Sequence, residues 1–154
     1  MYQSAHDAYL ESRVLSAGPL ELIEMLYQGA IGAVEDARNH LRNGRIAERA
    51  RAISKACAIL GELTASLNHE AGGELPGRLA GLYGYMQRKL LEANFQQSDS
   101  QLAEVLRLLS TLSEGWAEIS RPPAQLPAQT AWSQSQAGYA AEQESAYTAG
   151  NWSL

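Results

Sequence analysis

Apolar residues recur at alternating spacings of three and four positions along four stretches of the chain, near residues 19–42, 45–67, 76–94 and 98–120. This spacing places apolar side chains along one face of an α-helix. Alternating runs of β-branched residues, which would indicate strands, do not occur in the sequence. The pattern therefore predicts an all-α fold, an antiparallel four-helix bundle with short connections and shallow crossing angles.

Residues that start and stop helices mark the limits of this bundle. Gly18-Pro19 opens the first helix, because proline suits the first helical turn, and Asn43-Gly44 ends it. Arg121-Pro122-Pro123 stops the fourth helix. We expect a short irregular N-terminal segment at residues 1–17, because its apolar residues are scattered, and the bundle at residues 18–121.

Residues 122–154 differ in composition from the rest of the chain. They are rich in Ala, Gln and Ser, and Glu142 and Glu144 are their only charged residues. This composition is typical of a disordered, low-complexity tail. Four aromatic residues are spaced through the tail, and they serve either as anchors for a partner or as parts of a passive segment: Trp132, Tyr139, Tyr147 and Trp152.

The first predicted helix is apolar on more than one face. Its main stripe consists of Leu20, Ile23, Tyr27, Ala30, Val34, Ala37 and Leu41. Beside it lies a second apolar stripe, which consists of Leu22, Met25, Leu26, Gly29 and Ala33. One stripe serves the bundle core, so the other needs a separate cover. The spacing leaves three covers open: the N-terminal segment, an amphipathic helix of a partner, or a second copy of the chain.

The composition offers little chemistry. Apolar residues make up 45% of the 154 residues, the net charge is −5, and Cys57 is the single cysteine. Nucleotide-binding loops, nucleophile elbows and paired metal ligands are missing from the sequence. We therefore predict a protein without enzymatic activity, metal or cofactor. A bundle enzyme with charged residues at its centre is the weaker alternative, because the predicted core positions are apolar.

The same features bear on partners and location. An acidic chain does not favour nucleic-acid binding, and no apolar run is long enough to cross a bilayer. The N-terminus lacks the pattern of a secretory signal, and a lone cysteine suits a reducing compartment. We therefore expect a cytoplasmic protein that binds no nucleic acid and makes no stable membrane insertion.

Two further patterns leave alternatives open. Gly77, Gly81 and Gly84 share one face of the third predicted helix, where they either pack tightly inside the bundle or floor a groove for a partner's helix. Basic residues gather around the first helix hairpin and form either a solvated face or a docking patch for an acidic partner: Arg38, Arg42, Arg45, Arg49, Arg51 and Lys55.

Several stretches, taken in order, resemble the flagellar secretion chaperones, the FliS family. They are "YLESRVLSAGP", "ELIEMLYQGAIGAVEDA", "LTASLNHEAGGEL", "LAGLYGYMQRKLLEAN" and "LRLLSTLSEGW", which together span roughly residues 1–119. Gly18 replaces the family's usual serine before the first helix, and Gly84 replaces a common polar residue. The tail from Pro122 has no counterpart in the family pattern.

The resemblance implies a small antiparallel helix bundle that is a cytoplasmic export chaperone and not an enzyme. Such a chaperone binds the C-terminal segment of flagellin, prevents premature polymerisation and delivers flagellin to the export gate of the flagellar type III secretion apparatus. It would exist as a monomer or weak homodimer. The alternative is a helical dimerisation or adaptor module for another secretion component.

The resemblance, together with the doubled apolar face, also suggests a client-binding groove. Its residues would come from the first and third helices, although several of them must also serve the core: Leu20, Ile23, Leu26, Tyr27, Ala30, Leu82, Tyr83, Met86 and Leu90. Tyr9 and Leu15 in the N-terminal segment would form a removable lid over this groove.

Overall fold

The computed structural model describes residues 2–120, and the side chains of residues 4–120 within them. The described part is helical, with five α-helices and one short 3-10 helix. Their bounds are α1 Tyr2–Ser16, α2 Pro19–Arg42, α3 Ile46–Ala65, η1 His69–Ala71, α4 Leu75–Gln96 and α5 Asp99–Ser120. The prediction for the tail at residues 122–154 lies outside the described residues.

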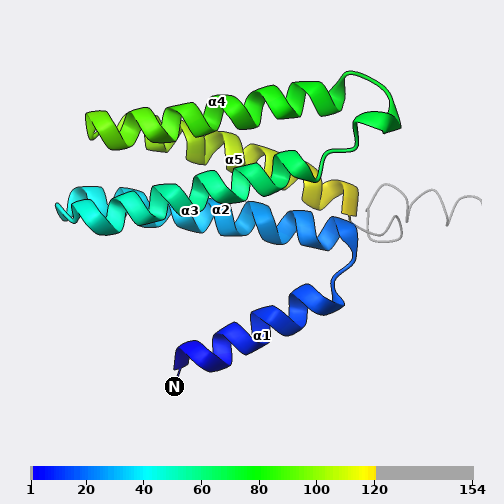
Figure 1. Ribbon diagram of the computed structural model, residues 1–154, viewed down its shortest axis with the longest axis horizontal. Coiled ribbons are helices and arrows are strands. Elements are labelled where there is room, and N and C mark those ends of the chain that lie inside the picture. The colour runs from blue at the N-terminus through cyan, green and yellow to red at the C-terminus, as the bar shows by residue number, and fades with distance from the viewer. Residues whose placement is uncertain (1, 121–154) are drawn as a thin grey trace, which may run out of the picture. The chain divides into compact units, whose positions relative to one another are not determined.

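Helices α2 to α5 lie alongside one another, and consecutive helices run in opposite directions (Figure 1). Each helix begins or ends within a few residues of the position that the sequence indicates, because the stop signals are local. Pro19 lies in the first turn of α2, and Asn43 caps its end with a backbone N–H bound to the carbonyl oxygen of Asn39. Gly44 follows with φ +67°, a left-handed conformation that glycine adopts without strain. The four predicted helices are therefore confirmed.

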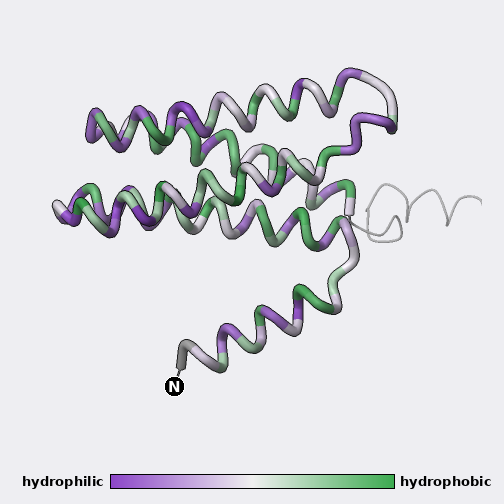
Figure 2. The backbone as a smooth tube through the Cα atoms, in the orientation of Figure 1, coloured by the Kyte–Doolittle hydropathy of each residue, from purple (hydrophilic) through white to green (hydrophobic). Residues whose placement is uncertain are grey.

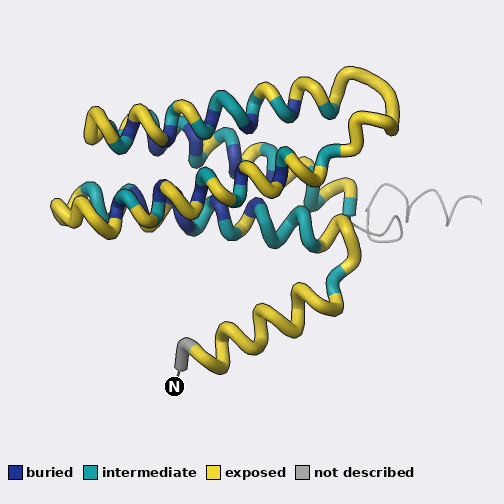
Figure 3. The backbone as a smooth tube through the Cα atoms, viewed as in Figure 1, coloured by how far each residue is buried: buried dark blue, intermediate teal, exposed yellow. Residues whose placement is uncertain are grey.

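The N-terminal segment is a helix, and the prediction of an irregular segment is wrong. α1 covers Tyr2–Ser16, and it contains neither glycine nor proline to interrupt it. Its apolar residues form no continuous stripe, so periodicity gave no sign of it. Every described side chain from Ser4 to Ser16 is exposed, as the yellow α1 in Figure 3 shows.

The core lies where the inward faces of α2 to α5 meet. Figure 3 shows the buried residues on these faces, and Figure 2 shows hydrophobic and hydrophilic residues alternating along each helix. The core members on α2 and α3 are Tyr27, Ala30, Ala33, Val34, Ala37, Ile53, Ala56, Leu60 and Leu63. Those on α4 and α5 are Leu79, Tyr83, Met86, Leu90, Ala93, Leu102, Val105 and Leu109.

Glycines behave differently on α2 and on α4. A Cβ atom placed on Gly29 would lie 3.3 Å from Cδ1 of Ile59, so α3 packs closely against α2 at this point. On α4, a Cβ atom on Gly77 or Gly81 would meet nothing within 4 Å, and one on Gly84 would meet only the side chain of Arg88. Of the two alternatives for these three glycines, tight packing inside the bundle is therefore contradicted. Their role as a groove floor for a partner stays a prediction.

Polar side chains tie the helices together at the end of the bundle near the α2–α3 turn. Nε of Arg38 on α2 donates to Oδ1 of Asp99 on α5 at 2.8 Å. Arg49 is buried, so it does not belong to a solvated basic face. Its guanidinium donates to Oδ1 and to the backbone oxygen of Asn94 on α4. The Arg38 guanidinium holds the pKa of the Asp99 carboxyl below its usual value by hydrogen bonding.

Candidate functional site

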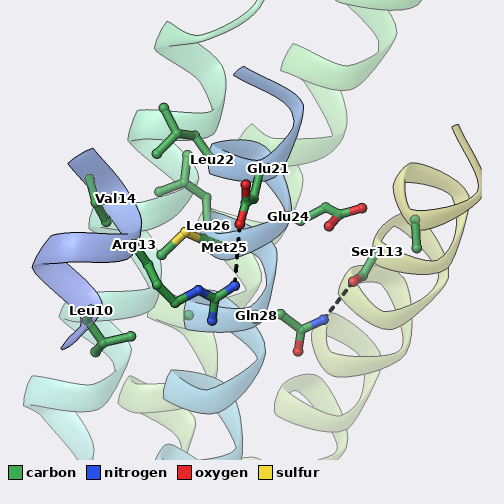
Figure 4. Close-up of a pocket in the computed structure, with 12 residues that line it drawn as sticks. Leu10, Arg13, Val14, Glu21, Leu22, Glu24, Met25, Leu26, Gln28 and Ser113 are labelled. Atoms are coloured by element: carbon green, nitrogen blue, oxygen red, sulfur yellow. Dashed lines mark hydrogen bonds and ion pairs between the residues drawn. The ribbon is translucent and has the colours of Figure 1, made fainter. Parts of the chain in front are cut away.

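A hollow lies beside the second apolar stripe of α2. It is a cavity of about 630 Å³ between α1, α2 and α5. Apolar residues make up most of its lining: Leu10, Val14, Leu22, Met25, Leu26, Gly29 and Ala117. Figure 4 shows Leu10 and Val14 of α1 facing Met25 and Leu26 of α2 across this space. The cavity is suited to apolar side chains of a peptide.

A small polar rim borders the cavity. Nε2 of Gln28 on α2 donates to Oγ of Ser113 on α5 at 3.0 Å, which joins two of the walls. A guanidinium nitrogen of Arg13 on α1 lies 3.7 Å from Oε1 of Glu21 on α2, and both side chains are about half exposed. Figure 4 shows both interactions. Exposed ion pairs of this kind contribute about 0–1 kcal/mol, so this pair adds little to the attachment of α1.

The second apolar stripe therefore has two covers. Ala33 lies in the core, and Gly29 packs against Ile59 of α3 while it also lines the cavity. Leu22, Met25 and Leu26 border the cavity, and α1 lies on its other side. Of the covers that the sequence left open, the N-terminal segment thus occupies this position, without filling the space.

The predicted client-binding residues separate into two groups. Tyr27, Ala30, Tyr83, Met86 and Leu90 are at most 1% exposed and belong to the core. The accessible group consists of Leu20, which is exposed, and of Ile23, Leu26 and Leu82, which are partly buried against the core. Of all nine, only Leu26 lines the cavity.

The two predicted lid residues, Tyr9 and Leu15, both lie on α1. Tyr9 is 60% exposed and Leu15 is 81% exposed, and neither lines the cavity. Leu10, Arg13 and Val14 are the α1 residues that do. Leu10 and Val14 are four residues apart, which places them on one helical face. A single pair at this spacing is too short a pattern to predict a helix.

A buried aromatic cluster supports the α2 wall from behind. The hydroxyl groups of Tyr27 on α2 and Tyr83 on α4 are hydrogen-bonded at 2.5 Å. Nε1 of Trp116 on α5 donates to the same Tyr27 hydroxyl at 3.0 Å. Burial raises the pKa of both tyrosines, and the hydrogen bond to Tyr27 raises that of Tyr83 further. The cluster fixes three helices relative to one another and keeps its hydroxyl groups neutral.

Neither a metal site nor a reactive thiol is found in the described part of the chain. Residues 2–120 contain no group of three or more His, Cys, Asp or Glu side chains that could hold a metal ion. Cys57 is half-buried, and burial raises the pKa of its thiol, which favours the unreactive protonated form. Within the same residues, no helix combines the length and apolar character that crossing a membrane requires.

Comparisons with known proteins agree on one family. The family model described as flagellar protein FliS matches residues 1–123. The chain is 44% identical over 112 residues to the flagellar secretion chaperone FliS of Salmonella typhimurium, which covers 72% of this chain and 83% of that protein. It is 40% identical over 111 residues to the flagellar secretion chaperone FliSB of Pseudomonas aeruginosa, covering 72% and 88%.

A relative of lower identity matches over a stretch of similar length. The flagellar secretion chaperone FliS of Campylobacter jejuni is 33% identical over 115 residues, covering 75% of this chain and 90% of that protein. The family model ends at residue 123, so most of the 122–154 segment lies beyond it.

Proposed function

The chain belongs to the family of the flagellar protein FliS, and from this premise we propose that it is an export chaperone that binds the C-terminal segment of flagellin. In this proposal, the chaperone holds newly made flagellin in the cytoplasm and prevents its polymerisation. It then delivers the client to the export gate of the flagellar secretion apparatus. It acts as a binding protein, without catalysis.

The cavity beside the second apolar stripe is the observation that carries the proposal. Its volume of about 630 Å³ and its apolar lining fit several aliphatic side chains of an amphipathic segment. Burying one Leu-sized side chain contributes about 1.5–3 kcal/mol. A few such anchors are enough to offset part of the cost of ordering a disordered client.

We place the client along α2 and across the mouth of this cavity. Leu20, Ile23, Leu26 and Leu82 are the predicted residues that remain accessible, and Leu22 and Met25 join them as cavity residues. The five buried members would contribute indirectly, by holding the α2 wall in place. α1 acts as the lid, through Leu10 and Val14, and the client displaces it.

The test is a pair of substitutions in the cavity with a matched control. Leu22→Ser combined with Met25→Ser should weaken binding of the flagellin C-terminal segment at least tenfold, because two apolar anchors lose their contacts. Leu75→Ser, at an exposed leucine at the start of α4, should leave affinity unchanged. Binding is measured by fluorescence anisotropy and folding by thermal unfolding. Equal affinity of the double variant and the wild type would contradict the proposed site.

A further inference from the structure

Charge is distributed unevenly between the two ends of the bundle. The turn end consists of residues 35–55 and 88–107, around the α2–α3 and α4–α5 turns (Figure 1). The cavity is lined by the first part of α2 and the last part of α5, and these parts lie toward the opposite end. The turn end contains nine of the chain's 12 Lys and Arg residues and six Asp and Glu residues, a net charge of +3. The opposite end, residues 19–34, 56–87 and 108–118, contains one basic and seven acidic residues, a net charge of −6.

Several basic side chains at the turn end are available for a partner. Arg45, Arg51 and Lys55 are exposed, and none of them takes part in an ion pair among residues 4–120. Arg38 and Arg49 are different, because they are engaged with Asp99 and Asn94. Arg45, Arg51 and Lys55 are therefore free to pair with carboxylates of a partner, as far as the described residues are concerned.

Large apolar side chains are exposed at the same end. Ile46 at the start of α3 is 63% exposed, and Leu91 and Phe95 near the end of α4 are 60% and 89% exposed. Leu91 and Phe95 are four residues apart, so they lie on one face of α4. Exposed apolar side chains thus share the turn end with cations that form no ion pair among residues 4–120. This combination fits an amphipathic, negatively charged segment.

The start of α3 is also unusual for a helix. Arg45 occupies its N-cap position and makes no side-chain capping hydrogen bond. A helix N-terminus carries partial positive charge and favours an anion, whereas arginine there has the opposite sign. A carboxylate supplied from outside would relieve this local conflict.

We propose that the turn end is a docking surface for an acidic, amphipathic segment of a partner protein. Carboxylates of the segment would pair with Arg45, Arg51 and Lys55, and its apolar side chains would cover Leu91 and Phe95. The surface lies away from the cavity, so a client in the cavity and a partner at the turn end can be bound together. The inference does not depend on what the cavity binds.

An anionic membrane is the competing occupant, and the charge pattern favours it less. Glu35, Asp36 and Glu48 are interspersed with the cations of the hairpin, and the whole chain has a net charge of −5. Polybasic segments that hold membranes concentrate positive charge without such acidic neighbours. A discrete acidic segment can instead pair with individual cations.

The experiment uses the full chain and a synthetic amphipathic helical peptide, with Leu and Phe on one face and Glu on the other. A matched peptide with every Glu replaced by Gln serves as its control. Binding is measured by fluorescence anisotropy at about 50 mM and about 300 mM NaCl, which differ strongly in screening length. The Glu peptide should bind, and its affinity should fall at the higher salt concentration, whereas the Gln peptide should bind at least tenfold more weakly.

Variants then locate the site. Arg45→Gln, Arg51→Gln and Lys55→Gln combined should lower affinity at least tenfold and reduce the salt dependence. Phe95→Ser should lower affinity severalfold without changing the salt dependence. Arg78→Gln, at an exposed arginine outside the turn end, should change neither. Thermal unfolding checks that each variant is folded.

Three results would overturn the proposal. Equal affinity for the Glu and Gln peptides would show that charge does not select the ligand. Unchanged affinity of the triple variant would place the binding site elsewhere. Binding to vesicles containing phosphatidylserine, with no binding of the Glu peptide, would assign the surface to a membrane.

Discussion

At the scale of single residues, buried hydrogen bonds give the bundle its specific arrangement. The Tyr27 hydroxyl accepts a hydrogen bond from the Trp116 N–H and forms a second hydrogen bond with the Tyr83 hydroxyl. Helices α2, α4 and α5 therefore meet at one polar point in an apolar core. A buried polar group without a partner costs about 1–3 kcal/mol. Each member therefore disfavours alternative packings in which its partner is absent.

This cluster predicts a specific response to alkaline pH. Because burial raises the folded-state pKa of Tyr27 and Tyr83, their stabilising effect is complete below the unfolded value near 10 and is lost as the pH rises above it. Tyr83→Phe should cost about 1 kcal/mol at neutral pH and reduce the loss of stability above pH ~10. Urea unfolding between neutral pH and pH ~11 measures both effects.

The matched control is Tyr9→Phe, at a tyrosine that is 60% exposed on α1. It should leave both the neutral stability and the alkaline response unchanged. If Tyr83→Phe behaved like this control, the buried hydrogen bond would have no energetic role.

At the scale of helices, local signals explain what could be predicted. Proline, asparagine and glycine mark the ends of α2, and the three-four spacing identifies all four bundle helices. α1 lacked such a stripe, so its helical state depended on intrinsic propensity alone and was missed. Periodicity shows that Tyr27 and Leu20 share a face of α2, but it does not show which of them the neighbouring helices cover.

The same limit explains why the cavity was not predicted as a whole. Its walls come from α1, α2 and α5, and their meeting depends on tertiary placement that no local spacing encodes. Leu22, Met25 and Leu26 were recognised as a stripe needing a cover. Ser113 and Ala117 were not, because they carry no signal that distinguishes them from other residues of α5.

Helix propensity predicts the effect of filling the open glycine positions on α4. Gly77→Ala and Gly81→Ala should each stabilise the protein by about 0.5–1 kcal/mol, because the new methyl groups meet no neighbour and alanine favours a helix. Gly29→Ala is the matched control. Its new Cβ would lie 3.3 Å from Ile59, so this substitution should stabilise the protein less than the two on α4. Urea unfolding measures all three. Destabilisation by either α4 substitution would show that this face is packed in solution.

The placement of α1 predicts which of its residues act as the lid. Leu10→Ser combined with Val14→Ser should strengthen client binding severalfold, because these residues face the cavity, and should leave the unfolding midpoint nearly unchanged. Tyr9→Ser combined with Leu15→Ser should have a smaller effect, because both residues are exposed and neither lines the cavity. Calorimetric titration with the flagellin C-terminal segment decides between the two pairs. A larger gain from the Tyr9 and Leu15 pair would favour the lid residues that the sequence predicts.

At the scale of the whole molecule, the bundle separates two kinds of surface. An apolar cavity lies toward the acidic end, and unpaired cations with exposed apolar side chains lie at the turn end. An export chaperone must hold a client and also engage a delivery partner, and separate surfaces allow both contacts at once. The substitutions in the cavity and at the turn end should therefore affect their own ligands independently.

The most direct measurement is a calorimetric titration of the full chain with the C-terminal segment of flagellin from the same organism, repeated at several temperatures. An N-terminal flagellin segment of equal length is the control. We expect saturable one-to-one binding of the C-terminal segment alone, with a negative heat-capacity change from buried apolar surface. Absence of binding by a folded chain, or equal binding of both segments, would contradict the claim that this protein is a flagellin export chaperone.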